Sequence, residues 1–219
     1  MELTRRRFLQ GTSGATTVAA GLVHTCASMG DPAGLWCWGG NEIGQLGDGT
    51  TDYFSVPVEV LNMQVLVTSL STSDSHTCAT AGGIMYCWGD NAYRQLGNAD
   101  AGEYSSGRLE VVGLRQAAFA AAGGTFSCVL RMEGDVVCWG ANDRGQLGDG
   151  TGIASETPVT VGLPGAAFFV TAGAAHACAI LAANGEVYCW GANVEGQLGD
   201  GSTVDRLSPV QACTSVTPT

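Results

Sequence analysis

Four pairs of cysteines recur along the chain in one local setting, and in three of them a histidine stands two residues before the first cysteine. In the first pair, His24 precedes Cys26, and Cys37 follows in the string Cys-Trp-Gly. Residues i and i+2 of a β-strand lie on one face, so His24 and Cys26 would point the same way. With Cys37 on the opposite strand, one imidazole and two thiolates could begin a zinc site.

The third copy favours disulfide bonds over metal. It carries Phe126 at the histidine position and still keeps both cysteines, so the pair does not need the histidine. Eight to ten residues separate the cysteines of each pair, which suits a β-hairpin whose opposed Cβ atoms lie near disulfide distance. We therefore interpret the histidines as structural and leave Cys213 without an assigned partner. The predicted disulfides are Cys26–Cys37, Cys78–Cys87, Cys128–Cys138 and Cys178–Cys189.

No other residues suggest a reaction centre. Asp48, Asp149 and Asp200 lie in Gly-Asp-Gly turns and could be imagined as calcium ligands. Each has few acidic neighbours, however, and Asp-Gly is a routine turn pair. No nucleophile elbow, phosphate loop or carboxylate pair stands apart from the repeat. We predict a protein that is not an enzyme and that needs neither a metal nor another cofactor.

The elements that carry the cysteines repeat about every 50 residues. Cys-Trp-Gly begins at residues 37, 87, 138 and 189, and each copy is followed by an asparagine and then by Gln-Leu-Gly. In most units a small-residue segment precedes the first cysteine and a Pro-Val segment follows the glycine-rich loop. Short runs bounded by glycine are typical of strands, and four strands in about 50 residues form a propeller blade. The predicted fold class is all-β, a β-propeller array of four four-stranded blades.

The side chains shared by all units predict how the blades pack. A four-stranded sheet cannot bury both faces alone, so neighbouring units must stack. Small residues such as Ala20, Ala121 and Ala172 suit an innermost strand near the axis. Trp38, Trp88, Trp139 and Trp190 recur in register, and we interpret them as packing between blades.

These motifs resemble the repeat of the regulator of chromosome condensation family. The string CWGGNEIGQLGDGT at 37–50 and its later copies carry the resemblance, which covers roughly residues 8–212. Members of that family form seven-bladed propellers, whereas this chain has four units. An open arc of four would expose two sheet faces. We expect a piece of a longer product, or an arc completed by a homo-oligomer, ahead of a closed ring of four.

We divide the chain into an N-terminal segment (1–17), four repeats (about 18–60, 61–112, 113–162 and 163–212) and a tail (213–219). Residues 4–10, with their three consecutive arginines, resemble a bacterial twin-arginine export signal that overlaps the first repeat. The segment is too short and too polar to span a membrane. Paired cysteines and this signal predict an extracytoplasmic location, secreted or periplasmic. The cytoplasm is the alternative, because cleavage near residue 20 would cut a strand.

The charge of the chain excludes one class of partner. The net charge is −11, with 9 basic and 20 acidic residues, and three of the basic residues are Arg5, Arg6 and Arg7. Nucleic-acid binding depends on neutralising phosphates, and a protein with this negative charge would repel them. We therefore expect a protein partner and not a nucleic acid.

Function should lie where the repeats differ, because residues present in every unit build the scaffold. We predict a non-catalytic protein-binding scaffold. The resemblance implies two alternatives, a guanine-nucleotide exchange factor for a small GTPase and a secreted propeller-type enzyme inhibitor. The loop of the second repeat is the candidate partner-binding segment, with Asn98, Asp100, Glu103, Tyr104 and Arg108.

Overall fold

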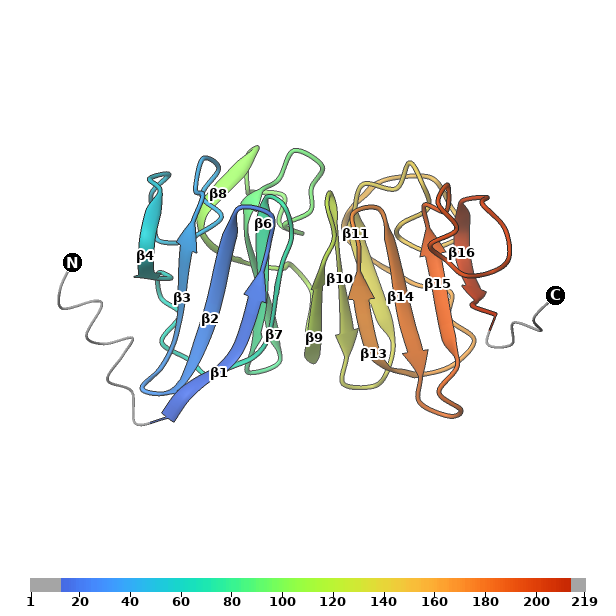
Figure 1. Ribbon diagram of the computed structural model, residues 1–219, viewed down its shortest axis with the longest axis horizontal. Helices are drawn as coiled ribbons and strands as arrows, with labels where there is room; N and C mark the ends of the chain where they lie inside the picture. The colour runs from blue at the N-terminus through green and yellow to red at the C-terminus, as the bar shows by residue number, and fades with distance from the viewer. Residues whose placement is uncertain (1–12, 214–219) are drawn as a thin grey trace.

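A computed structural model describes residues 13–213, which fold into four antiparallel sheets of four strands each (Figure 1). In every sheet the strands lie side by side in chain order. The predicted fold class is therefore confirmed. None of the described residues forms a helix that could cross a membrane.

Each sheet is one blade, and the blades follow one another along the chain. Blade 1 contains β1 (Ser13–Ala20), β2 (His24–Asp31), β3 (Ala33–Gly39) and β4 (Phe54–Glu59), and blade 2 contains β5 (Val67–Thr72), β6 (His76–Ala81), β7 (Ile84–Asp90) and β8 (Tyr104–Glu110). Blade 3 contains β9 (Ala117–Ala122), β10 (Phe126–Arg131), β11 (Val136–Gly140) and β12 (Ser155–Thr160), and blade 4 contains β13 (Ala167–Ala172), β14 (His176–Leu181), β15 (Val187–Gly191) and β16 (Arg206–Gln211).

The first strand of each blade lies nearest the axis of the array. Contacts between successive first strands join blade 1 to 2, 2 to 3 and 3 to 4, and no comparable packing joins β1 to β13 among the described residues. The four blades thus form an open arc, coloured from blue to red along the chain in Figure 1. Small side chains at the ends of these strands, including Ala20, Ala122 and Ala172, line a cavity at the axis.

The hydrophobic core is divided into three layers, one between each pair of neighbouring blades. The layer between blades 2 and 3 contains Cys78 and Cys87 of the earlier blade and Trp139 of the later one, all fully buried. Each of the other two layers also contains one disulfide and one tryptophan. Burial of each sheet face therefore depends on the neighbouring blade, as expected for stacked repeats.

The fourth strand of each blade is its outer edge. Pro57 lies in β4 and Pro158 in β12, where the missing N–H faces away from the neighbouring third strand. We call the end of the array with the turns between first and second strands and the long third-to-fourth loops the loop end. The end with the tight turns between second and third strands is the hairpin end. In Figure 1 the loop end is uppermost.

Candidate functional site

All eight predicted cysteines are engaged in disulfides within their own blades. Cys26 bonds Cys37, Cys78 bonds Cys87, Cys128 bonds Cys138 and Cys178 bonds Cys189. In every blade the two cysteines are directly opposed on the second and third strands, with Cα atoms 4.1–4.2 Å apart. Such close pairs are the non-hydrogen-bonded kind, in which side chains approach most closely. Cys213 is exposed and has no disulfide partner.

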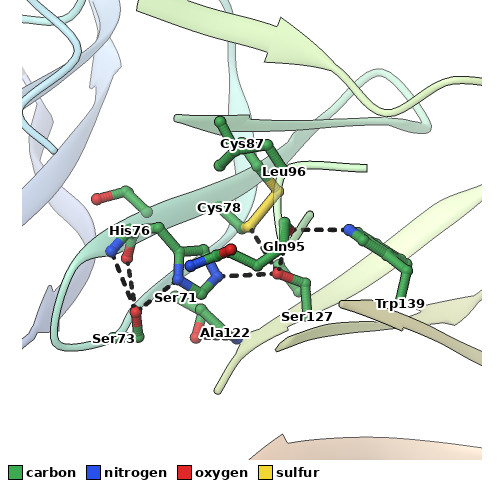
Figure 2. The surroundings of a disulfide bond; sticks show 12 residues. Ser71, Ser73, His76, Cys78, Cys87, Gln95, Leu96, Ala122, Ser127 and Trp139 are labelled. Atoms are coloured by element: carbon green, nitrogen blue, oxygen red, sulfur yellow. Dashed lines mark hydrogen bonds between the residues drawn. A yellow bond between two sulfur atoms is a disulfide. The ribbon is translucent and has the colours of Figure 1, made fainter. Parts of the chain in front are cut away.

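The histidines face the next blade and not the cysteines. Nε2 of His76 lies 2.9 Å from the hydroxyl of Ser127 in blade 3 (Figure 2). Ser127 in turn donates to the main-chain carbonyl of Gln95 at 2.8 Å, and the indole N–H of Trp139 donates to the same oxygen at 2.9 Å. These three side chains and one main-chain carbonyl make a buried polar junction between blades 2 and 3.

The junction between blades 1 and 2 has the same arrangement. Nε2 of His24 lies 2.7 Å from the hydroxyl of Thr77, which donates to the carbonyl of Gln45 at 3.0 Å. Trp88 donates its indole N–H to that carbonyl at 2.9 Å. The sequence interpretation of the histidines as structural and of the tryptophans as packing between blades holds at both junctions.

The third junction replaces the polar pair by an apolar one. Phe126 of blade 3 occupies the histidine position, and Ala177 of blade 4 occupies the hydroxyl position, both fully buried. Trp190 still donates its indole N–H to the carbonyl of Gln146, at 3.0 Å. The histidine and the hydroxyl residue are replaced together, because either one buried without its hydrogen-bond partner would be destabilising.

Burial determines the ionisation of these histidines. It lowers the pKa of His24 to about 4. Burial first, and then repulsion from the positive charge that His24 would carry if protonated, lowers the pKa of His76 to about 3. The pKa of His176, at the open end of the array, is also lowered by burial. Rings held neutral inside a blade junction are structural groups, and among residues 13–213 no three His, Cys, Asp or Glu side chains are placed to hold a metal ion.

The aspartates of the Gly-Asp-Gly turns bind their own loops. Asp48 accepts hydrogen bonds from the N–H and the hydroxyl of Thr50 at 3.1 and 2.9 Å, and Asp149 does the same with Thr151 at 2.9 Å each. Hydrogen bonds from Ser202 hold the pKa of Asp200 well below its ordinary value. These carboxylates close turns, and their oxygens are occupied by the protein.

The predicted partner-binding residues lie along the outer rim of blade 2 and are not gathered at one point. Asn98 donates to the carbonyl of Glu110, at the end of β8. Asp100 donates its main-chain N–H to the side chain of Asn98, and the carbonyl of Glu103 accepts from Asn91. The loop therefore runs back along β8 toward the loop end, where Tyr104 begins the strand with about half of its surface exposed.

Arg108 is separated from the rest of that loop. It lies within β8, and its guanidinium stands 4.2 Å from the ring centroid of Tyr86 on the adjacent strand. A cation over an aromatic ring is an attractive contact that holds the arginine against its own blade. The structure thus places four of the five residues on the rim loop or the start of β8 and assigns Arg108 a packing contact.

A groove at the loop end contains side chains that sequence reasoning did not select. It is lined by Asp74 and Tyr93 of blade 2, by Asp143 and Arg144 of blade 3, and by the turn at residues 174–175 of blade 4. Tyr93 is 54% exposed. Arg144 forms an ion pair with Asp205 at 3.0 Å. Two further carboxylates line the groove, Asp74 and Asp143, and Asp143 accepts a hydrogen bond from the side chain of Gln146 at 3.0 Å. Comparison of the repeats does flag Tyr93 and Arg144, because they occupy positions at which the units differ.

Sheets stacked around an axis, with one polar or apolar pair at every junction, define the chain as a propeller-type repeat protein. A model of the regulator of chromosome condensation (RCC1) repeat matches residues 33–80, 133–180 and 184–217, and a second model of the same repeat matches 67–95, 119–146 and 169–197. The chain belongs to the regulator of chromosome condensation repeat family.

Curated relatives agree with this assignment. Human E3 ubiquitin-protein ligase HERC2 is 32% identical over 199 residues, and the human probable E3 ubiquitin-protein ligase HERC4 is 30% identical over 198 residues. Each alignment covers 88% of this chain but only 4% and 19% of the relative. The chain therefore corresponds to a small part of these proteins.

Solved structures show the same fold within longer chains. Human WBSCR16 superposes with a TM-score of 0.84 at 25% identity, covering 93% of this chain and 54% of that one. Yeast RCC1 (Prp20), solved bound to Kap60, superposes with a TM-score of 0.81 at 20% identity, covering 94% of this chain and 50% of that one. This chain spans about half the length of both.

Proposed function

We propose that the chain is a non-catalytic scaffold that binds a protein with a basic surface at the groove of the loop end. The observation that carries the proposal is the exposed Tyr93, which lines one groove together with Asp74 and Asp143. Tyrosine is enriched at protein interfaces because its rigid ring offers both apolar area and a polar tip. Carboxylates in the same groove favour lysine or arginine side chains on the partner.

The repeated polar side chains support the scaffold part of this proposal. The buried histidines of blades 1 and 2 and the tryptophans of blades 2 to 4 are engaged in blade junctions, and the recurring asparagines are engaged in their own loops. Residues available to a partner are therefore those that vary among the units. The rim loop with Asn98, Asp100, Glu103 and Tyr104 extends this variable surface, because Tyr104 pairs with Asp90 at the start of the loop that carries Tyr93.

We propose that this scaffold acts outside the cytoplasm. Four disulfides within one chain favour an oxidising environment, since cytosolic thiols are kept reduced. The predicted export signal lies almost entirely outside the described residues. A secreted or periplasmic protein is consistent with this disulfide content.

Selection of binding peptides tests the proposal. A random peptide library displayed on phage is selected against the oxidised chain, and we expect enriched peptides to be rich in arginine and lysine. Tyr93→Ala and Asp74→Asn should each weaken binding about tenfold or more, whereas Glu133→Gln, an exposed acid at the hairpin end, should not. Peptides without basic residues, or binding that neither groove variant alters, would contradict the proposal.

A nucleotide-release assay distinguishes the exchange-factor alternative. The loops between third and fourth strands hold 14, 13, 14 and 14 residues, so none of these four loops carries an insertion relative to the others. We expect the chain to leave nucleotide release from small GTPases unchanged. Acceleration by the wild type would replace the scaffold proposal with the exchange-factor one.

A further inference from the structure

The two ends of the arc are the two halves of one more blade junction. We call the side of a blade that faces the following blade its trailing face, and the side that faces the preceding blade its leading face. We propose that two copies of this chain join head to tail, with the trailing face of blade 4 against the leading face of blade 1 of the second copy. Two such contacts close a ring of eight blades.

The matching of side chains across the internal junctions carries the inference. Each trailing face supplies a ring and each leading face supplies its partner: His24 meets Thr77, His76 meets Ser127, and Phe126 accompanies Ala177. A histidine is thus always paired with a hydroxyl, and the one phenylalanine with an alanine.

The unpaired ends obey the same rule. The trailing face of blade 4 presents His176, and the leading face of blade 1 presents Thr25, which stands opposite Trp38 just as Thr77 stands opposite Trp88. His176 and Thr25 are therefore a complementary polar pair at the two ends of one chain. An alanine at position 25, or a phenylalanine at 176, would have left the two faces mismatched.

The trailing face of blade 4 is incompletely covered at the positions that the internal junctions bury. Gln197 is half-buried, whereas Gln45, Gln95 and Gln146 are at most 4% exposed. His176 and Cys178 are also half-buried, while their counterparts in blades 1 to 3 are at most 2% exposed. Gln197, His176 and Cys178 therefore occupy the positions of junction residues, but they are less buried than the equivalent residues of the three internal junctions.

The leading face of blade 1 is also open. Val18 of β1 is 69% exposed, whereas Val170, its counterpart in β13, packs against blade 3 and is 3% exposed. Val18 stands opposite Ala27, and Val170 stands opposite Ala179, so the two valines have the same register. Thr25 is half-buried, whereas Thr77 and Ser127 are completely buried.

A second copy would cover both faces at once. The contact is heterologous, because different faces meet, and such contacts form closed rings when the rotation between copies closes. Two arcs of four blades give eight, which is within the usual range for propellers. The groove at the loop end is not part of either face, so this proposal stands apart from the proposed function.

The mass of the 219-residue chain in solution is the first test. Light scattering after size exclusion should give twice the mass of one chain at micromolar concentration under oxidising conditions. A single-chain mass at every concentration would overturn the proposal, and growth beyond two copies would overturn the closed ring.

Exchange of the polar pair for the apolar one tests the contact. His176→Phe alone and Thr25→Ala alone should each raise the dissociation constant about 100-fold, roughly tenfold for each of the two contacts. The double variant should regain much of the lost affinity, because it copies the Phe126 and Ala177 junction. Residues 25 and 176 belong to blades 1 and 4, so additive effects in the double variant would reject the pairing.

Mixing two blocked variants distinguishes head-to-tail contact from a symmetric one. Thr25→Arg obstructs the leading face and His176→Arg obstructs the trailing face, so each variant alone should be a single chain. An equimolar mixture should form pairs through the two remaining faces. If either variant alone still formed pairs, like faces would be meeting, and the proposal would be wrong.

Discussion

The ring of His24 donates from Nε2 to the hydroxyl oxygen of Thr77, 2.7 Å away in the next blade. The direction follows from the hydroxyl, which has one hydrogen and gives it to the carbonyl of Gln45. The threonine oxygen must therefore accept, and His24 is neutral with its proton on Nε2. Its Nδ1 atom is buried without a hydrogen-bond partner, so protonation there would place a charge in an apolar layer.

Acid should therefore destabilise the protein before its carboxylates titrate. The pKa of His24 falls from 6.5 in the unfolded chain to about 4 in the folded one, and that of His76 falls to about 3. Between the unfolded and the folded pKa, the unfolded state binds more protons than the folded state. The contribution of each neutral ring to the free energy of unfolding is therefore fully present above pH 6.5 and is lost as the pH decreases. Each ring should contribute a loss of about 2 kcal/mol between pH 7.5 and pH 5. Urea unfolding at both pH values measures it.

The control for this prediction is the double variant His24→Phe/Thr77→Ala. It copies the junction of Phe126 with Ala177, and Gly21 already supplies the space that Gly123 gives to the phenylalanine ring. The loss of stability on acidification should be smaller by about 2 kcal/mol in this variant. An unchanged pH dependence would show that His24 is not the group that titrates.

A glycine beneath each junction tryptophan should tolerate no side chain. A Cβ atom added to Gly97 would lie 2.7 Å from Nε1 of Trp139, and its φ is +64°. Gly97→Ala should cost about 3 kcal/mol or more in the free energy of unfolding, from backbone strain and overpacking together. Gly113→Ala measures the backbone strain alone, because the φ of Gly113 is +74° and an added Cβ atom would have no neighbour within 4 Å. This variant should cost about 1 kcal/mol in the free energy of unfolding. Equal costs in the two variants would remove the tryptophan contact from the explanation.

Much of this architecture could be predicted from the sequence because the repeat aligns equivalent residues. The order of strands, the disulfides and the packing of Trp88 and Trp139 between blades follow from position within a unit. The partner of His24 is 53 residues away, in another unit, so a description of single units could not name it. The joint change to Phe126 and Ala177 was visible in the sequence, but its meaning requires knowing which faces meet.

The candidate site was harder to predict for the same reason. Asp74, Tyr93 and Asp143 come from different turns and two blades, and only the curvature of the arc brings them to one groove. The predicted loop was selected because it departs most from the repeat. That departure has partly a structural cause, since Arg108 replaces the proline of other outer strands and packs on Tyr86.

The disulfides should contribute a large share of the stability. Cys128 and Cys138 are fully buried and ten residues apart in sequence, so opening this loop should cost about 3 kcal/mol by the chain-entropy account. We expect the variant Cys128→Ala/Cys138→Ala to lose at least this amount in urea unfolding. Cys213→Ala, which removes an exposed free thiol, should change the free energy of unfolding by less than about 0.5 kcal/mol. If the double variant were as stable as the wild type, the bonds would not be needed to hold the blades.

The buried asparagine of each unit should be needed to shape its long loop. Asn142 accepts from the N–H of Leu147 at 3.0 Å and donates to the carbonyls of Thr151 and Ile153 at 3.0 Å each, with only 1% of its surface exposed. Asn142→Ala leaves these groups without partners, so it should cost about 3 kcal/mol. It should also speed amide hydrogen exchange at residues 143–154. Asn184→Ala, which removes one exposed contact to the N–H of Glu186, should cost less than about 0.5 kcal/mol. Fast exchange confined to the hairpin end, or equal costs in the two variants, would show that the asparagine does not organise the loop that carries Asp143 and Arg144.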